Sequence, residues 1–299
     1  MKRSNIKLSL IFLILFSFFS VSCLASEIKS KVKKSCLWEI INNGKHVYLL
    51  GSIHMMKKEA YPLNPAIEKA YKDSEGIVFE TDLDAVNEVS FQLRMMSSGM
   101  YRDGKTLRET LSEKTYLRVT KKIQEYGLEL ARFDLFKPWF CAMAISMAEL
   151  KRLGLDPEFG IDNYFFKRAK QENKSLFFLE SLDFQLELFS AMDDQNQNLF
   201  LEQTLKDVEN IEKVFPEIVK YWEFGNLEKL GLAINENFID YPEIYERFII
   251  SRNNKWLSRI DSFIKHNKNI LIVVGAAHLV GEKGLIRVLR KKGFKVEQR

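Results

Sequence analysis

The sequence predicts an α/β fold: a central, mainly parallel sheet flanked by helices, with two large helical insertions that form a cleft over the strand ends. Three observations predict this fold. Continuous apolar runs at residues 47–50 and 270–274 are typical of buried strands, and each is followed by a Gly that we expect to end the strand at a sharp turn. A strand, a helix and a strand follow one another between residues 46 and 80, as in a parallel βαβ unit. Long stretches with helical spacing, about 85–153 and 183–266, supply the insertions.

The first elements begin with a β-hairpin. Residues 37–41 and 46–50 are two strand-like runs joined by a turn that contains Gly44. Asn64 and Pro65 then provide an N-cap and a first helical residue, so we expect a helix to begin there. Residues 76–80 form the next strand.

The remaining elements are mostly helices. Ser112 is placed to cap one helix that Gly127 closes, and Pro138 opens another that is apolar almost all round and ends at Gly154, which predicts a buried helix. Strands follow at 175–180 and 270–274, and a helix over 284–292 precedes a short strand at 294–298. A continuous helix is predicted over 245–265.

Composition and charge narrow the class of protein. A chain of 299 residues with 46% hydrophobic residues buries a sizeable core. The formal charge of +5 comes from the first 34 residues, which carry seven Lys or Arg against Glu27. The remainder is nearly neutral with interspersed charges, so we expect no nucleic-acid partner. The expected partner is a peptide or small-molecule substrate, and the sequence does not define an oligomeric state.

The N-terminus has the pattern of an export signal. Residues 1–25 combine a basic start with an apolar stretch over 8–21, which predicts a signal peptide, followed by a basic lead-in at 26–36 and the folded domain at 37–298. We therefore expect a protein exported from the bacterial cytoplasm, periplasmic or secreted. Membrane contact is expected only if Cys23 is lipidated or the signal stays uncleaved, and the apolar stretch is short for a span. Cys36 and Cys141 are predicted either to form a disulfide or to be two buried thiols.

Four predicted strands end in groups able to bind a metal or move a proton: His54, Glu80, Glu180 and His278. Two of them share the pattern of a buried strand, Gly, two residues and His, and ligands of α/β proteins bind at the carboxyl ends of strands. Two imidazoles with one or two carboxylates suit Zn²⁺, Mn²⁺ or Fe²⁺ and leave positions for water and substrate. Without a metal, a His beside a Glu can act as general base. The sequence leaves both versions of hydrolysis open.

Each of these residues also has a structural alternative. A single Gly-x-x-His is weak evidence, whereas two copies after buried strands favour a shared site. Glu80 and Glu180 could be capping residues of the turns that follow. His46 and His266 are expected to be structural.

The predicted helix over 245–265 carries an apolar stripe with one cation, Arg252, in its middle. A buried guanidinium without a partner is costly, so Arg252 should meet a carboxylate or another anionic group. It is a candidate for binding a substrate carboxylate or an oxyanion. A structural salt bridge to an acidic residue of another helix is the alternative.

Taken together in order, these motifs resemble the TraB/GumN family, which is related to the Tiki-type proteases. The resemblance covers residues 36–298. Its pieces are Leu37-Trp38-Glu39, Tyr48 to His54, Phe79-Glu80, Lys137-Pro138-Trp139, Gly160-Ile161-Asp162, Leu179-Glu180-Ser181 with Gln185, Arg252-Asn253 with Trp256, and Val274 to Leu279 with Gly281 and Gly284. Ala276-Ala277 stands where Ala-Gly is common in the family.

The resemblance implies a fold like that of erythromycin esterases and ChaN-like haem-binding proteins. It also implies a divalent-metal-dependent peptidase site with Mn, Co, Zn or Fe. Carried over, the catalytic residues are His54, Glu80 and His278, supported by Arg252 and Asn253. The metal ligands are His54, Glu80, His278 and Glu180, and Asp162 matches a further family position.

Three functions therefore compete with a fourth possibility, an exported effector or interaction protein whose motif residues only hold the fold. The first is a metal-dependent hydrolase of the peptidase type. The second is a haem- or iron-binding protein like the ChaN-like relatives, against which the acidic Glu80 and Glu180 weigh. The third is a metal-free, esterase-like hydrolase.

Overall fold

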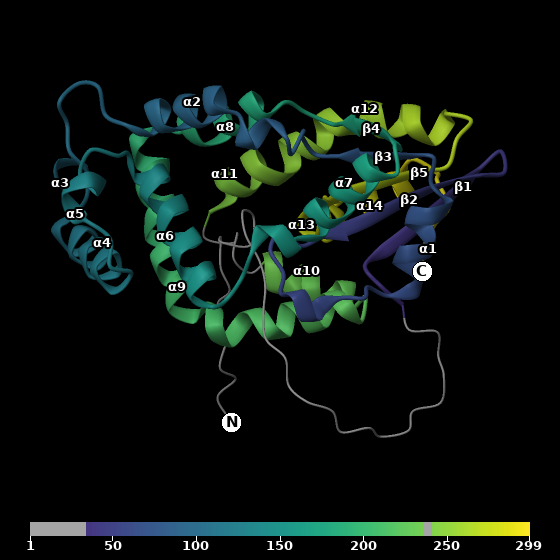
Figure 1. Cartoon of the computed structure of the whole chain (residues 1–299), viewed down its shortest axis with the longest axis horizontal. Coiled ribbons are helices and arrows are strands. Elements are labelled where there is room, and N and C mark those ends of the chain that lie inside the picture. Colours follow the sequence, from purple (N-terminus) through teal and green to yellow (C-terminus); the bar gives the residue numbers. More distant parts are fainter. Residues whose placement is uncertain (1–33, 236–240) are drawn as a thin grey trace, which may run out of the picture.

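The computed structural model describes residues 34–235 and 241–299 (Figure 1). The predicted signal peptide and nearly all of the basic lead-in fall on residues 1–33 and lie outside the described residues. Among the helices that are described, none is both long enough and apolar enough to span a membrane. Cys36 and Cys141 are both free and buried, so the disulfide alternative is not realised in the structure.

A six-stranded mixed sheet organises the described residues, and the prediction of an α/β fold is confirmed. The strands are β1 (Leu37–Asn42), β2 (Lys45–Ser52), β3 (Gly76–Phe79), β4 (Ser175–Phe178), β5 (Ile270–Gly275) and β6 (Val296–Gln298). Their order in the sheet is β4-β3-β5-β2-β1-β6. The four strands from β4 to β2 are parallel, while β1 runs antiparallel to both β2 and β6.

Strand β5 lies at the centre of the parallel part. Strands β2 and β3 are parallel as predicted, but they are not neighbours, because β5 pairs with both of them. All six residues of β5 are buried, as expected of a strand covered on both faces. The register places Gly51 opposite Val274 and Ser52 opposite Gly275, so the two Gly-x-x-His segments leave the sheet side by side.

The first Gly of this pair has a different role from the one predicted. Strand β2 continues through Gly51 to Ser52, so this Gly does not end the strand. A Cβ at Gly51 would lie 2.6 Å from Cys36 Sγ and 3.2 Å from Ala276 Cα. The requirement is therefore close approach of neighbouring chain segments and not a sharp turn.

Helices cover the sheet and extend away from it. They are α1 (Pro65–Asp73), α2 (Val89–Gly99), α3 (Leu107–Thr110), α4 (Glu113–Glu125), α5 (Leu130–Phe133), α6 (Pro138–Arg152), α7 (Ile161–Gln171), α8 (Leu182–Ser190), α9 (Asp194–Glu223), α10 (Leu227–Asn235), α11 (Pro242–Tyr245), α12 (Ser251–Lys265), α13 (Ala276–Leu279) and α14 (Leu285–Lys291). As expected, Asn64 caps α1 by accepting a hydrogen bond from the Ala66 amide, and Ser112 caps α4 through the Thr115 amide.

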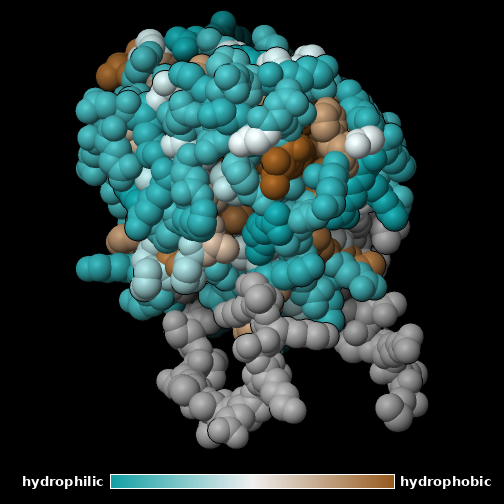
Figure 2. All heavy atoms as spheres, turned by 90° about the vertical axis from the view of Figure 1, so that its right-hand side faces the viewer, coloured by the Kyte–Doolittle hydropathy of each residue, from teal (hydrophilic) through white to brown (hydrophobic). Residues whose placement is uncertain are grey.

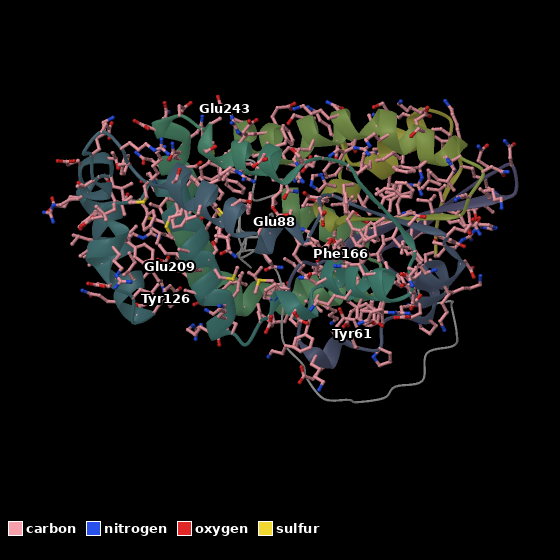
Figure 3. The ribbon with its side chains drawn as sticks, turned by 45° about the horizontal axis from the view of Figure 1, so that its top comes forward. Tyr61, Glu88, Tyr126, Phe166, Glu209 and Glu243 are labelled. Carbon is pink, nitrogen blue, oxygen red and sulfur yellow. The ribbon has the colours of Figure 1, made fainter. Side chains whose placement is uncertain are left out.

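The two predicted helical regions lie beside the sheet. In Figure 1 the sheet occupies the right-hand part, α3, α4 and α5 lie at the far left, and α6 and α9 stand between them. Helices α6 and α9 pack against each other, and Trp139 of α6 stacks on Phe189 of α8 with ring centroids 5.8 Å apart. Figure 3 shows Phe166 of α7 near the middle of the molecule, where its ring meets Phe79 of β3 edge-on at 5.4 Å.

The predicted continuous helix over 245–265 is wrong in one respect. A π-helical segment, η5 (Glu246–Ile250), separates α11 from α12. Apolar spacing of three and four residues does not distinguish one wider turn from regular helix, and single π turns are frequent at functional sites. This turn immediately precedes Arg252.

The face of the molecule in Figure 2 is mainly hydrophilic, with separate apolar spots rather than one broad apolar area. Nothing on this face suggests an extended apolar contact surface. A cavity lies instead at the carboxyl ends of the parallel strands.

Candidate functional site

The carboxyl ends of β2, β3 and β5, with the segment that follows β4, bring four side chains together. His54 follows β2, Glu80 follows β3, Glu180 follows β4 and His278 lies on α13 directly after β5. All four lie at the same edge of the sheet because the parallel strands end there. Arg252, from the first turn of α12, reaches into the middle of this cluster.

The first imidazole is held by the start of α7. His54 Nδ1 lies 2.7 Å from Asp162 Oδ2, and Ser52 Oγ donates to Asp162 Oδ1 at 2.8 Å. Helix α7 comes this close because Gly160 precedes it: a Cβ there would lie 2.0 Å from the carbonyl oxygen of His54. With Nδ1–H directed at the carboxylate, His54 Nε2 faces Gly275 and Glu80.

The second imidazole is held by α12. His278 Nδ1 lies 2.8 Å from Asn253 Oδ1, and the Asn253 amide nitrogen donates to the backbone carbonyls of His278 and Lys283. These two carbonyl acceptors fix the orientation of the amide, so its oxygen accepts and His278 Nδ1 carries the proton. Trp256 packs on the imidazole with ring centroids 4.4 Å apart.

Arg252 uses all of its hydrogen-bond donors. Nε donates to Glu180 Oε1 at 3.0 Å, and Nη2 donates to Glu180 Oε1 at 2.6 Å and Glu80 Oε2 at 2.5 Å. Nη1 donates to the Phe248 carbonyl at 3.2 Å and to His278 Nε2 at 3.0 Å. A guanidinium has five N–H groups, and five contacts account for them. The residue is 5% exposed, so in this conformation it is a buried salt bridge rather than a free anion receptor.

The two glutamates are fixed from several sides. Glu80 Oε1 accepts from the Gly275 amide at 2.7 Å, and Glu180 Oε2 accepts from Trp256 Nε1 at 2.8 Å. Gln185 Nε2 donates to Glu180 Oε1 at 3.0 Å and to Glu80 Oε2 at 3.4 Å. Both carboxylates are thus positioned before any ligand arrives.

The charge distribution separates the two imidazoles. Burial opposes a charge on His54, but the adjacent Asp162 carboxylate and the nearby Glu80 outweigh it and raise the pKa of His54 to about 9. Its side chain is 31% exposed, so solvent screens part of this attraction. Burial and the Arg252 guanidinium lower the pKa of His278 to about 3. Burial raises the pKa of Glu80, but Arg252 and both imidazoles outweigh it and hold that pKa well below its usual range. At neutral pH the site therefore favours a cation at His54 Nε2 and keeps His278 neutral.

The donor chemistry suits a divalent ion, although the donors are not converged on one point. Both imidazoles are held through Nδ1 by an outer acceptor and direct Nε2 inward, which is the arrangement of metal-binding histidines. His278 Nε2 lies 3.8 Å from Glu80 Oε1. Within residues 34–235 and 241–299, however, no group of three or more His, Cys, Asp or Glu is placed to hold a metal ion. Arg252 Nη1 engages the His278 lone pair, and a metal ion would have to displace a proton from His54 Nε2 at neutral pH.

A cavity of about 310 Å³ opens beside this cluster. Its polar end is formed by His54, Glu80, Asp162, Gln185 and Arg252. The rest of the wall is mostly apolar and comes from β3, from the residues around α2, and from α6, α8 and η5. The strand-end cluster therefore has a space in which a substrate can meet it.

The sequence patterns located four residues that the structure brings together. They did not identify the side chains that hydrogen-bond to these four residues or pack against them. Asp162 matched a family position without an assigned role, and Gln185 and Trp256 were recognised only as parts of motifs. Each acts on the cluster from a helix far away in the sequence. The only available signal was an Asp in the first turn of a helix, which ordinary capping also explains. His46 and His266 lie outside the cluster, His46 beside Glu39 on the hairpin and His266 after α12.

The fold and the cluster define an α/β protein with a paired Gly-x-x-His centre at the carboxyl edge of its parallel strands. The chain belongs to the TraB/PrgY/gumN family, whose family model matches residues 36–298. This confirms the resemblance found in the motifs.

Individual relatives are distant. The chain is 24% identical to the uncharacterized protein YbaP of Escherichia coli (strain K12), over 82% of this chain and 88% of YbaP. It is 22% identical to the metalloprotease TIKI2 of Xenopus tropicalis, over 88% of this chain and 59% of that protein. It is also 22% identical to the metalloprotease TIKI homolog of Nematostella vectensis, over 93% of this chain and 72% of that protein. No solved structure matches the chain.

Proposed function

We propose that this protein is an exported hydrolase that cleaves an amide or ester bond, most directly a peptide bond, at the centre formed by His54, Glu80 and His278. One observation carries the proposal: both imidazoles are held in the same way by a neighbouring side chain. Each is fixed through Nδ1, by Asp162 or by Asn253, and each presents Nε2 on the side of Glu80 Oε1. Similarity to proteins named metalloproteases supports hydrolysis of peptides.

A divalent ion is part of this proposal. His54 Nε2 and Glu80 Oε1 would hold it, and His278 Nε2 would join them if Arg252 Nη1 withdrew. Such an ion supplies Lewis acidity, which makes water more acidic and polarises a carbonyl. The Asp162 and Glu80 carboxylates that raise the pKa of His54 attract positive charge, and they would also attract a metal ion that displaces the proton from Nε2.

The chain's own residues perform the remaining tasks. Asp162 keeps the His54 ring in one tautomer and orientation, and Asn253 does the same for His278. Arg252 and Gln185 each donate hydrogen bonds to both Glu80 and Glu180. These bonds fix the two carboxylates in place, and the positive charge of Arg252 offsets the repulsion between them. The cavity holds the substrate against the cluster and excludes bulk water.

One contact favours a second version that uses no metal. Arg252 Nη1 takes up the lone pair of His278 Nε2, which removes one donor from the expected ligand set. In that version, His54 carries a proton at neutral pH and donates it from Nε2 to the leaving group. The haem alternative gains no support, because the acidic Glu80 lies beside both imidazoles and Arg252 occupies the His278 lone pair.

The test is hydrolysis of fluorogenic peptides by the purified protein, with and without a chelator and with Mn²⁺ or Co²⁺ added back. We expect turnover that falls with chelator, returns with metal and is lost in His54→Gln. His266→Gln, which changes an exposed His outside the cluster, is the matched control and should retain full activity. Turnover that is lost in His54→Gln but indifferent to chelator would select the metal-free version. Equal turnover in His54→Gln and wild type would contradict the proposed site.

A further inference from the structure

The cavity beside the cluster is markedly asymmetric. The titratable groups are confined to one end, at the sheet edge. The remaining wall includes Phe91 and Met95 of α2, Met143 of α6, Leu186 and Phe189 of α8, and Phe248 of η5. A volume of about 310 Å³ lies at the lower end of the range of roughly 300–1,000 Å³ for small-molecule sites. It accommodates one bulky group rather than several residues of a polypeptide.

Apart from His54, which the proposed function assigns to the scissile bond, the charged side chains at this end already have partners. Arg252 already donates to five acceptors, so it has no donor left for a substrate carboxylate. Glu80 and Glu180 are paired with it, and Asp162 is engaged by Ser52 and His54. A charged group in the apolar part would lose its hydration without gaining a partner.

One hydroxyl group in the wall of the cavity has no hydrogen-bond partner among the described residues. It belongs to Thr81, which follows Glu80, lines the cavity and is 4% exposed. Buried hydroxyls in native proteins are almost always paired. The Thr81 oxygen is closed off from the cavity in this conformation, so it can meet a ligand only after the side chain rotates.

We infer that the cavity binds a bulky apolar group attached next to the scissile bond, and that Thr81 hydrogen-bonds the amide or ester of the same substrate. This inference rests on the proposed function and adds its substrate class. The preferred substrates carry a large aliphatic or aromatic group at the cleaved bond, and substrates with small or charged groups there are poor. A Leu or Phe side chain of a peptide and a medium-length acyl chain offer the same chemistry.

Two adjacent methionines allow a sharp test. Met95 lines the cavity, whereas Met96 is 50% exposed and does not line it. Met95→Trp should fill part of the cavity, and Met96→Trp adds the same ring to the same helix outside it. The substrates are N-acetylated aminoacyl fluorogenic amides with Phe, Leu, Ala or Asp, together with nitrophenyl esters of two to ten acyl carbons.

We expect kcat/KM for Phe and Leu to exceed that for Ala by about tenfold to a hundredfold, the ratio that burial of one large apolar side chain gives. Asp should be poorer than Ala. Met95→Trp should reduce the advantage of Phe and Leu at least severalfold, and Met96→Trp should leave it unchanged. A preference confined to the long acyl esters would identify the occupant as an acyl chain. Hydrolysis without any preference for bulky apolar groups, or equal effects of both Trp variants, would overturn the inference and leave the proposed function standing.

The absence of any cleavage would count against the proposed function. The inference about the cavity can then still be tested by measuring ligand binding. The probes are N-acetyl-phenylalanine amide and N-acetyl-glycine amide, with affinities measured by calorimetry. We expect the Phe compound to bind at least about tenfold more tightly to wild type and Met96→Trp, but not to Met95→Trp. Thr81→Val should weaken both compounds by a similar factor, because it removes only the hydroxyl. Equal affinities of the two compounds for wild type would overturn the inference.

Discussion

Replacement of Arg252 by Met removes the centre of the buried network while keeping an unbranched side chain of comparable length. Two carboxylates that were each held by the guanidinium, Glu80 and Glu180, then lose their cation inside the protein. Their side chains are 10% and 6% exposed, so water does not replace the lost partner. Removing one partner of a buried ion pair costs about 3–5 kcal/mol, and the upper half of that range applies here because two anions are left.

The assay is urea unfolding of the purified protein at pH 8. With a denaturant dependence of about 3 kcal/mol per molar urea, Arg252→Met should lower the midpoint by at least about 1 M. Arg259→Met on the same helix is the control: this Arg is exposed and makes one long hydrogen bond to the Leu179 carbonyl, so its loss should cost less than about 0.5 kcal/mol. The cost at Arg252 should shrink toward pH 4, since Glu80 can then take up a proton. A loss below about 1 kcal/mol at pH 8 would refute the reasoning.

Three further predictions concern the surroundings of His54. Because its folded pKa of about 9 exceeds the value of about 6.5 in the unfolded chain, its contribution to stability is complete below pH 6.5 and is lost as pH rises through 9. The unfolding free energy should therefore fall as the pH rises through this window, by at most about 1.4 kcal/mol per pH unit. The His54→Gln variant should show a flatter dependence of unfolding free energy on pH. If the variant and the wild type showed the same dependence, the ion pair between His54 and Asp162 would not be its cause. Asp162→Asn should reduce kcat by about 10- to 100-fold with little change in folding, as measured by peptide hydrolysis and circular dichroism, and an unchanged kcat would mean that the carboxylate does not position the ring. Gly51→Ala should destabilise the protein by about 1–3 kcal/mol in thermal unfolding, and Cys36→Ala in the same chain should restore part of the loss; failure of that rescue would show that the thiol contact is not the cause.

The sequence was most informative where a local pattern has one structural meaning. A continuous apolar run indicates a buried strand, and the residue after it lies at the edge of the sheet, so His54, Glu80, Glu180 and His278 could be placed at one edge without knowing the strand order. The central position of β5 could not be predicted from pattern, because pairing of strands about 200 residues apart leaves no local trace.

The partners of these residues were less accessible. The apolar stripe on 245–265 identified Arg252 as a buried cation and required an anionic partner, but it did not decide which one. The structure supplies the two strand-end glutamates rather than an acid on another helix. Asp162 reaches His54 across 108 positions of sequence, and only the folded chain shows that contact. The π turn before Arg252 and the close approach at Gly51 depend on tertiary packing in the same way.

We propose that the two Gly-x-x-His motifs form one site that takes a divalent ion. Titration of the purified protein with Co²⁺, followed by its visible absorption, tests this claim most directly, because the spectrum reports the ligands as well as the stoichiometry. We expect one ion per chain, with binding lost in both His54→Gln and His278→Gln and retained in His266→Gln. Absence of binding to the wild type, or binding that is unchanged in the two site variants, would contradict it.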